Sequence, residues 1–245
     1  MPCPSWFQCP FEMENKLTEP GPPSSQSGEQ AIPTEAAKVT PSRGVAAVVA
    51  VAGFSRRMGR FKPLLPWRNG TVIEAVAAAL EAGGASPVQV VTGHRGAEIA
   101  RFLEGGPAKV VFNPDYARNE MLRSYQVGIG ALREACLPMQ GALLALGDQP
   151  HIPAEVIKQI VDRARSEPDA VVIPSHNRRR GHPVYMPEWS FAELLGLEPG
   201  QKLRDMLSDF SDEIVYVDVD SDCIRKDMDV PAEYESLRAE YGQVS

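Results

Sequence analysis

Apolar runs alternate with amphipathic helical patterns along most of this chain, and this alternation restricts the possible folds more than any other sequence feature. The first run, Val45 to Val51, is rich in β-branched residues and is followed by a polar loop that contains glycine. Thr71 and Glu74 have the spacing of a capping box, which predicts a helix from there to Gly83. Further apolar runs occupy 88–92, 109–112, 142–146, 170–173, 183–186 and 214–219, and further helices are predicted at 97–103, 122–135, 154–165, 203–210 and 232–240.

Most of the predicted strands are apolar throughout rather than on alternate residues. Such strands are typical of parallel sheets that helices cover on both faces. The predicted fold is therefore α/β, with a three-layer, mostly parallel sheet between two helical layers. In open sheets of this kind, ligands bind beyond the carboxyl ends of the strands, so the residues that follow each apolar run are the candidates for a functional site.

The N-terminal segment, residues 1–43, has a different composition from the rest of the chain. It holds 8 of the 22 prolines and several Ser, Gln and Gly residues, with almost no periodic apolar positions after Phe11. We expect this Pro/Ser-rich tail to be disordered; the alternative, a docking peptide built on Trp6 and Phe7, has no further support in the sequence. Residues 44–245 have a length that suits a single domain.

The charge and cysteine content exclude several classes of protein. The net charge of −7 gives no general attraction for nucleic acid or for an anionic membrane, so phosphate binding must be local. No window is apolar enough over about 18 residues to span a bilayer. Four widely spaced cysteines form neither a disulfide framework nor a metal-ligand pattern. A cytoplasmic protein without nucleic-acid or membrane partners is predicted.

The loop after the first strand, 52–62, combines glycine with basic residues. Gly53 and Gly59 allow backbone N–H groups to approach an anion closely, and Arg57 and Lys62 add positive charge. This composition predicts a site for the phosphates of a nucleoside triphosphate; the alternative is a solvated basic turn. The loop has neither the spacing of the G-x-x-x-x-G-K-[ST] phosphate loop nor that of the G-x-G-x-x-G dinucleotide motif.

A carboxylate follows the buried run at 142–146. Asp148 stands at the carboxyl end of that strand, where one or two carboxylates together with phosphate oxygens can hold Mg²⁺. Pro150 prevents the strand from continuing. From the residues alone, Asp148 is either a metal ligand or a cap for the helix that begins near Pro153.

Several of these segments together resemble a known family. The run Ala52 to Lys62 resembles the A-G-x-S-x-R-M-G-x-x-K signature of the nucleotidyltransferases that include molybdenum cofactor cytidylyltransferase and molybdopterin guanylyltransferase. Gly147-Asp148-Gln149-Pro150, Gly181-His182-Pro183 and Asp227-Met228-Asp229-Val230-Pro231 follow in the family's order, so that the resemblance covers about residues 45–234. The chain departs from the family at Val51, which is usually a small residue, and at Val230, which is usually Thr.

The resemblance implies a Rossmann-like, glycosyltransferase-A-like sheet and a role for each motif. The loop, with Ala52, Gly53, Ser55, Gly59 and Arg57, would bind the β and γ phosphates, and Lys62 would stabilise the α-phosphate. Asp148 and Asp229 would hold Mg²⁺, with Asp227 as the alternative second ligand. The residues implied to approach the nucleotide are Thr92, Gly93, Asn113 and Ser124. Those implied to approach the acceptor are Gly181 and His182.

The basic run Arg178-Arg179-Arg180 allows three interpretations: a nuclear-type cluster, a solvated turn, or a site for the phosphate of the acceptor. The family resemblance favours the last, because the adjoining Gly-His-Pro segment lines the acceptor pocket there and arginine pairs well with phosphate. His182 could act as a base or could simply pack, since an ionised phosphate nucleophile needs no base.

The resemblance implies transfer of CMP from CTP to the phosphate of molybdenum cofactor, with Mg²⁺ and with release of pyrophosphate. Alternatives are a GTP-using molybdopterin guanylyltransferase, a sugar-phosphate nucleotidyltransferase, and a non-catalytic nucleotide-binding partner of a molybdoenzyme. A molybdoenzyme could also be a partner of the active enzyme. A nicotinamide-dependent oxidoreductase is disfavoured, because G-x-G-x-x-G is missing after the first strand. Gly128-Ile129-Gly130 lacks its final glycine and is interpreted as helix packing.

Overall fold

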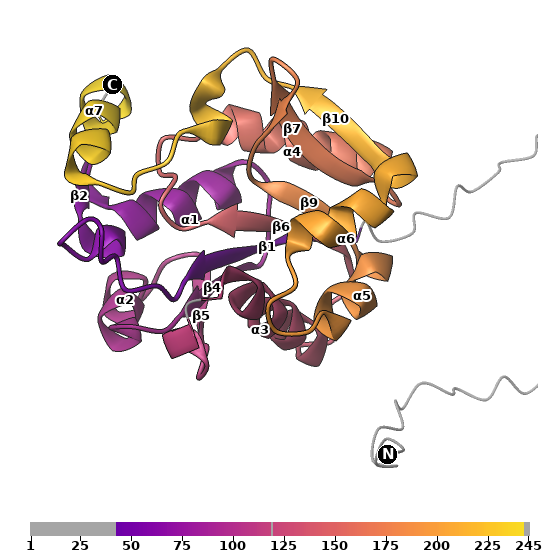
Figure 1. Cartoon of the computed structure of the whole chain (residues 1–245), viewed down its shortest axis with the longest axis horizontal. Helices are drawn as coiled ribbons and strands as arrows, with labels where there is room; N and C mark the ends of the chain where they lie inside the picture. Colours follow the sequence, from indigo (N-terminus) through magenta and orange to yellow (C-terminus); the bar gives the residue numbers. More distant parts are fainter. Residues whose placement is uncertain (1–42, 119, 243–245) are drawn as a thin grey trace, which may run out of the picture. The chain divides into compact units, whose positions relative to one another are not determined.

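An eight-stranded sheet runs through the part of the chain that the computed structural model describes, residues 43–118 and 120–242 (Figure 1). Its strands are β1 (Gly44–Val51), β4 (Val88–Thr92), β5 (Ala108–Phe112), β6 (Met139–Leu146), β7 (Val171–His176), β8 (Arg179–Arg180), β9 (Val184–Pro187) and β10 (Ile214–Asp218). The predicted tail, apart from Arg43, lies outside the described residues.

The strand order is β10-β7-β9-β6-β1-β4-β5, and β8 pairs with β7. β1 runs parallel to both β4 and β6, β4 runs parallel to β5, and β10 runs parallel to β7. Only β9 and the short β8 run antiparallel to their neighbours. The prediction of a mostly parallel, Rossmann-like sheet is therefore confirmed.

Helices cover both faces of this sheet, as predicted. The helices are α1 (Val72–Ala82), α2 (Gly96–Phe102), α3 (Met121–Glu134), α4 (Ala154–Ser166), α5 (Phe191–Gly196), α6 (Leu203–Asp209) and α7 (Pro231–Tyr241). Alternate residues of β1 point to the two sides. Val45, Ala47 and Val49 pack with α1, α2 and α4, while Ala46 and Val48 pack with α3, α5 and α6. Two separate apolar cores result, one on each face of the sheet.

The best-defined helix boundary is the start of α1. The hydroxyl of Thr71 accepts from the backbone N–H of Glu74, and the carboxylate of Glu74 accepts from the backbone N–H of Thr71 at 2.8 Å. These two bonds satisfy N–H groups that a helix leaves without partners in its first turn. The capping box predicted at this position is confirmed.

A third, smaller apolar cluster connects α7 to the first half of the chain. The two-stranded hairpin of β2 (Pro66–Trp67) and β3 (Gly70–Thr71) contributes Trp67, which packs with Tyr234 and Leu237 of α7. The hydroxyl of Tyr234 also donates to the carbonyl of Pro66 at 2.7 Å. This cluster fixes the position of α7, and with it the segment that precedes α7.

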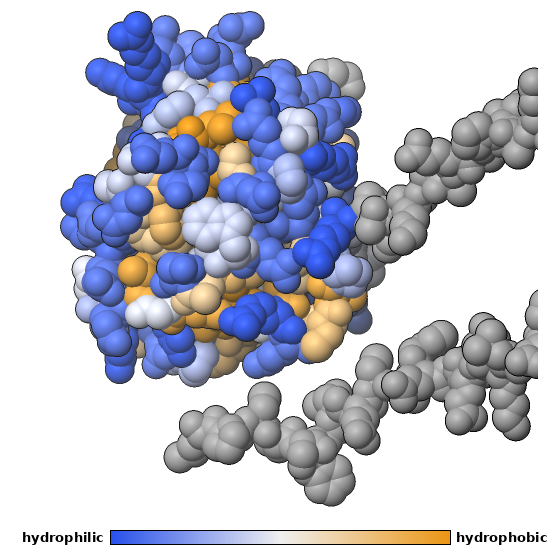
Figure 2. Space-filling view, turned by 90° about the vertical axis from the view of Figure 1, so that its right-hand side faces the viewer, coloured by the Kyte–Doolittle hydropathy of each residue, from blue (hydrophilic) through white to orange (hydrophobic). Residues whose placement is uncertain are grey.

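None of the helices in residues 43–118 and 120–242 is long and apolar enough to cross a membrane. Figure 2 shows that hydrophilic residues cover most of one side of the domain, with apolar patches between them. The large exposed apolar side chains of the described part are Phe102, Phe112, Met121, Leu137, Trp189 and Tyr216.

The two glycines of α3 provide a matched test of the packing between this helix and β1. A Cβ atom at Gly128 would lie 2.3 Å from Cγ1 of Val48, whereas a Cβ atom at Gly130 would have no heavy atom within 4 Å. We predict that Gly128→Ala destabilises the protein by about 1–3 kcal/mol through overpacking. Gly130→Ala should stabilise it by about 0.5–1 kcal/mol through helix propensity. Urea unfolding of both variants measures the difference, and equal effects would contradict the packing model.

Candidate active site

A cavity of about 520 Å³ opens beyond the carboxyl ends of β1 and β6. In the sheet, β1 lies between β4, which comes next along the chain, and β6, which comes later after α3. The strand order therefore reverses at β1, and the cavity lies at this point. Of the predicted site residues, Ala52, Gly53, Ser55, Arg57, Lys62, Ser124, Asp148 and Asp229 all line this cavity. They come from four separate segments of the chain.

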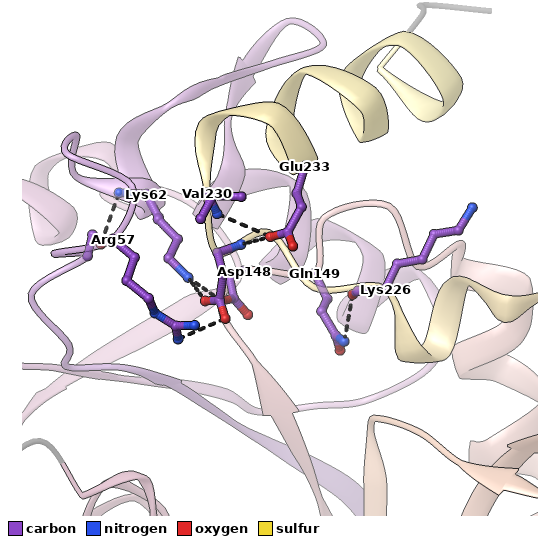
Figure 3. Close-up of polar contacts among 9 residues, drawn as sticks. Arg57, Lys62, Asp148, Gln149, Lys226, Val230 and Glu233 are labelled. Atoms are coloured by element: carbon purple, nitrogen blue, oxygen red, sulfur yellow. Dashed lines mark hydrogen bonds and ion pairs between the residues drawn. The ribbon is translucent and has the colours of Figure 1, made fainter.

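Lys62 lies between two carboxylates on the floor of the cavity (Figure 3). Its Nζ donates to Oδ2 of Asp148 at 2.8 Å and to Oδ1 of Asp229 at 2.7 Å. Burial alone would lower the pKa of Lys62, but the charges and hydrogen bonds of Asp148 and Asp229 outweigh it and raise the pKa above its ordinary value. The lysine is therefore a permanent cation.

Asp229 is held by two cations. Besides Lys62, the guanidinium of Arg57 reaches its Oδ2 at 2.8 Å. The hydrogen bond from Lys62, together with the charges of Lys62 and Arg57, lowers the pKa of Asp229 below its ordinary value. Lys62 and Arg57 in the loop after β1 thus contact Asp229, which lies 167 positions after Lys62 in the sequence.

The loop itself is fixed by local contacts. The side-chain oxygen of Ser55 accepts from the backbone N–H of Lys62 at 3.1 Å, which closes the loop around the cavity entrance. Gly59 has a φ of +66° in the turn that the bond from its N–H to the carbonyl of Arg56 closes. Gly59 does not line the cavity, so its conformation, rather than a direct contact, shapes the loop.

Four hydrogen bonds fix the segment that carries Asp229, two of them within the segment and two to the loop after β6. The carboxylate of Glu233 accepts from the backbone N–H groups of Asp229 at 2.7 Å and of Val230 at 3.1 Å. The amide of Gln149, one residue after Asp148, donates to the carbonyl of Lys226 at 3.1 Å (Figure 3). His151 contacts the carbonyl of Cys223 at 3.0 Å. These bonds place Asp229 opposite Asp148.

The two carboxylates have the chemistry of a divalent-cation site. Their oxygens converge on one positively charged group, and Mg²⁺ in nucleotide sites is typically held by one or two carboxylates, with phosphate oxygens and water completing the shell. In residues 43–118 and 120–242 no three His, Cys, Asp or Glu side chains group into a site made of protein ligands alone. Asp148 and Asp229 therefore fit a metal ion that arrives with a phosphate-bearing substrate.

Asp227, the alternative to Asp229, does not line the cavity. Burial and the negative charges of Asp148 and Asp229 raise its pKa. The carboxylate of Asp227 thus lies near Asp148 and Asp229, but these two and not Asp227 form the ion pairs with Lys62.

The remaining predicted residues lie around the cavity rather than in its lining. Thr92 donates to the carbonyl of Val111, and Asn113 donates to the side-chain oxygen of Ser124 at 3.2 Å. A Cβ atom at Gly93 would lie 2.3 Å from Cβ of Tyr116, and one at Gly181 would lie 2.5 Å from the carbonyl oxygen of Ile224. These glycines permit close packing of the loops that support the site.

His182 is fixed mainly through its backbone. Its N–H donates to the carbonyl of Ile224 at 3.0 Å, and burial lowers the pKa of its imidazole. A neutral, packed imidazole agrees with the second of the two interpretations of this residue.

The three arginines of the basic run are exposed on the hairpin between β7 and β9. The guanidinium of Arg180 donates to the hydroxyl of Tyr216 at 2.6 and 3.0 Å and covers its ring. Among the residues that the structure describes, Arg178, Arg179 and Arg180 form no ion pair with a carboxylate.

The cavity also contains side chains that the sequence analysis did not select. Phe54, from the loop after β1, and Tyr116, Glu120 and Met121, from the region between β5 and the start of α3, line this cavity. The family resemblance covers the segments that contain Tyr116, Glu120 and Met121, but it selected Asn113 and Ser124 from them, because single aromatic and acidic residues in loops have no distinctive spacing. Gly147 leaves space for the side chain of Val51, since a Cβ atom there would lie 1.8 Å from Cγ1 of Val51.

The two hydrogen bonds that Glu233 accepts predict that this residue holds Asp229 in its position beside Lys62. We expect Glu233→Ala to weaken the binding of Mn²⁺ by about tenfold and to destabilise the start of α7 by about 1 kcal/mol, because the backbone N–H groups of Asp229 and Val230 lose their acceptor. Glu235→Ala, an exposed neighbour on the same helix, is the control. Calorimetric titration of both variants measures the effect, and equal affinities would show that Glu233 has no part in holding Asp229.

The buried His151 predicts a dependence of stability on pH. Burial lowers its pKa below the ordinary 6.5, so the unfolded chain binds more protons as the pH falls below that value. The free energy of unfolding should therefore decrease between about pH 7 and pH 5.5, by at most about 1.4 kcal/mol per pH unit from this group. His151→Gln should show a shallower decrease in urea midpoints; an unchanged slope would assign the effect to other residues.

Comparison with known proteins places this arrangement in a family. The model of the MobA-like NTP transferase domain matches residues 47–214. Molybdenum cofactor cytidylyltransferase of Escherichia coli (strain K12) is 26% identical over 200 residues, which cover 80% of this chain and 97% of that protein. Nicotine blue oxidoreductase of Paenarthrobacter nicotinovorans is 29% identical over 146 residues, which cover 57% of this chain and 69% of that protein.

A solved structure agrees with these relatives. A nucleotidyl transferase from Methanothermobacter thermautotroptrophicus superimposes with a TM-score of 0.69 at 25% identity, over 81% of this chain and 97% of that one. The matched region begins within β1, includes the basic loop and Asp148, and extends to the start of β10. Because this match spans more than half of the sequence, the chain belongs to the family of MobA-like NTP transferase domains.

Proposed function

We propose that this protein transfers CMP from CTP to the phosphate of molybdenum cofactor and releases pyrophosphate. The observation that carries the proposal is the contact of Lys62 with both Asp148 and Asp229 inside a cavity that the basic loop borders. This arrangement supplies positive charge for a triphosphate and carboxylates for the metal ion that accompanies it.

In the proposed reaction, an oxygen of the acceptor phosphate attacks the α-phosphorus of the nucleotide. A new P–O bond forms, and the bond between the α-phosphorus and the oxygen that bridges to the β-phosphate breaks. The acceptor phosphate is already ionised at neutral pH, so no side chain has to remove a proton. Catalysis then consists of holding the reacting groups in line and neutralising the charge that develops on the leaving pyrophosphate.

Each residue of the site has a task in this scheme. The backbone of the loop from Gly53 and the guanidinium of Arg57 bind the β and γ phosphates, since both border the cavity and Arg57 is mostly exposed. Lys62 stabilises the α-phosphate and the leaving oxygen. Asp148 and Asp229 would hold Mg²⁺, which supplies a Lewis acid that neutralises phosphate charge.

CTP is the proposed nucleotide because the curated relative that covers most of this chain bears the name of a cytidylyltransferase. Ala52, in place of a second glycine before the loop, and the Gly-Asp-Gln-Pro and Gly-His-Pro segments favour the same branch. GTP and sugar phosphates are the alternatives that the family resemblance left open. The proposed location of this reaction is the cytoplasm.

The acceptor is proposed to enter on the side of β9. His182 follows the exposed arginine hairpin, and burial and a bond to Ile224 fix its position close to Asp148. Arg178 and Arg179 form no ion pair among the described residues and can therefore pair with an anionic acceptor. A molybdoenzyme that receives the product is the proposed protein partner.

A panel of nucleotides tests the proposal directly. We expect pyrophosphate release with CTP, Mg²⁺ and molybdenum cofactor, and a loss of at least about 100-fold in Asp148→Ala, because the phosphates lose the charge that the metal supplies. CTP at about 100 times its Kd should also raise the free energy of unfolding by about 2.7 kcal/mol. Asp212→Ala, a variant of an exposed carboxylate outside the cavity, is the control.

The other outcomes separate the alternatives. Turnover with GTP alone would identify a guanylyltransferase, and turnover with a sugar phosphate would identify another acceptor. Stabilisation by CTP without turnover would indicate a nucleotide-binding partner. Stabilisation by NAD(P) but by no triphosphate would contradict the proposal and favour an oxidoreductase.

A further inference from the structure

Part of the cavity lining, formed by the loop after β1 and the segment before α3, is aromatic and apolar. Phe54 and Tyr116 lie there with ring centroids 5.6 Å apart, and the guanidinium of Arg56 lies 4.8 Å from the centroid of Phe54. Met121, half exposed at the start of α3, adds a further apolar surface. Walls of this kind accommodate a planar ring, since aromatic faces stack on bases of any type.

The hydroxyl group of Ser124 can donate a hydrogen bond in the same part of the cavity. The backbone N–H of Asp115 donates to Oδ1 of Asn113 at 2.9 Å, which orients the amide so that its nitrogen faces Ser124. That nitrogen donates to the side-chain oxygen of Ser124 at 3.2 Å. Because this oxygen accepts from Asn113, and no described residue accepts a bond from it, Ser124 can donate its own proton into the cavity.

Glu120 provides the complementary group. It lies next to Met121 at the cavity wall and, among the residues that the structure describes, takes part in no hydrogen bond or ion pair. The nearby Asp115 differs, since its carboxylate pairs with Arg123 at 2.9 Å. An ionised carboxylate accepts hydrogen bonds and donates none. Glu120 is thus an acceptor without a donor at the edge of a flat pocket.

We propose that Glu120 determines nucleotide specificity by accepting a hydrogen bond from the exocyclic amine of the base, while Ser124 donates to a ring acceptor of the same base. This inference rests on the proposed function and adds to it an explanation of how the site would select CTP over UTP. Cytosine carries an amine at position 4, whereas uracil carries a carbonyl oxygen there. A carboxylate attracts the amine and repels the carbonyl, so Glu120 selects cytosine.

The variant Glu120→Gln tests this role, because glutamine can donate to a carbonyl as well as accept from an amine. The ratio of kcat/KM for CTP to that for UTP should fall by about tenfold, and the ratio of the two Kd values should change equally. Glu120→Asp keeps an acceptor and should retain the preference for CTP. Glu134→Gln, an exposed change at the other end of α3, is the control and should leave both ratios unchanged. Thermal unfolding verifies that each variant is folded.

The possible results distinguish this inference from the proposed function. If the wild type binds and uses CTP in preference to UTP but Glu120→Gln keeps that preference, Glu120 does not read the base and the inference is overturned. A higher KM for the acceptor with an unchanged nucleotide ratio would assign the carboxylate to the acceptor, which also overturns it. If the wild type binds CTP but transfers no nucleotide, the Kd ratio still tests Glu120 while the proposed function fails.

Discussion

The contact of one ammonium group with two carboxylates determines how the site is built. Asp148 and Asp229 carry like charges and would repel each other at close range, so their approach requires a cation between them. Lys62 supplies that cation within 2.8 Å of both groups, and Arg57 shares the charge of Asp229. The order of the strands, the loop after β1 and the position of α7 all serve to bring these groups together.

The position of Asp229 depends on contacts from two directions. The segment between β10 and α7 carries Asp229, and it is tied to the loop after β6 through Gln149 and His151. On its other side, α7 packs on the β2–β3 hairpin through Trp67 and Tyr234. Asp229 is therefore placed by contacts with two separate parts of the fold, the loop after β6 and the β2–β3 hairpin.

Local patterns predicted most of the fold and part of the site. Apolar runs located the strands, the Thr71 capping box located a helix start, and the A-G-x-S-x-R-M-G-x-x-K spacing selected a loop that borders the cavity. The antiparallel direction of β9 and the short helix α5 were missed, because direction depends on pairing with distant strands and short helices have little periodicity. Phe54, Tyr116 and Glu120 were missed as site residues, because their importance follows from a cavity that forms only in three dimensions.

The order in which the site residues occur along the chain has a consequence for biosynthesis. Lys62 is made first and can meet Asp148 as soon as β1 and β6 pair, whereas Asp229 follows 81 positions after Asp148, since 229 − 148 = 81. Asp229 also follows β10, the last strand of the sheet, so every strand is synthesised before it. The pair of carboxylates that contacts Lys62 can therefore form only after the whole sheet has been made.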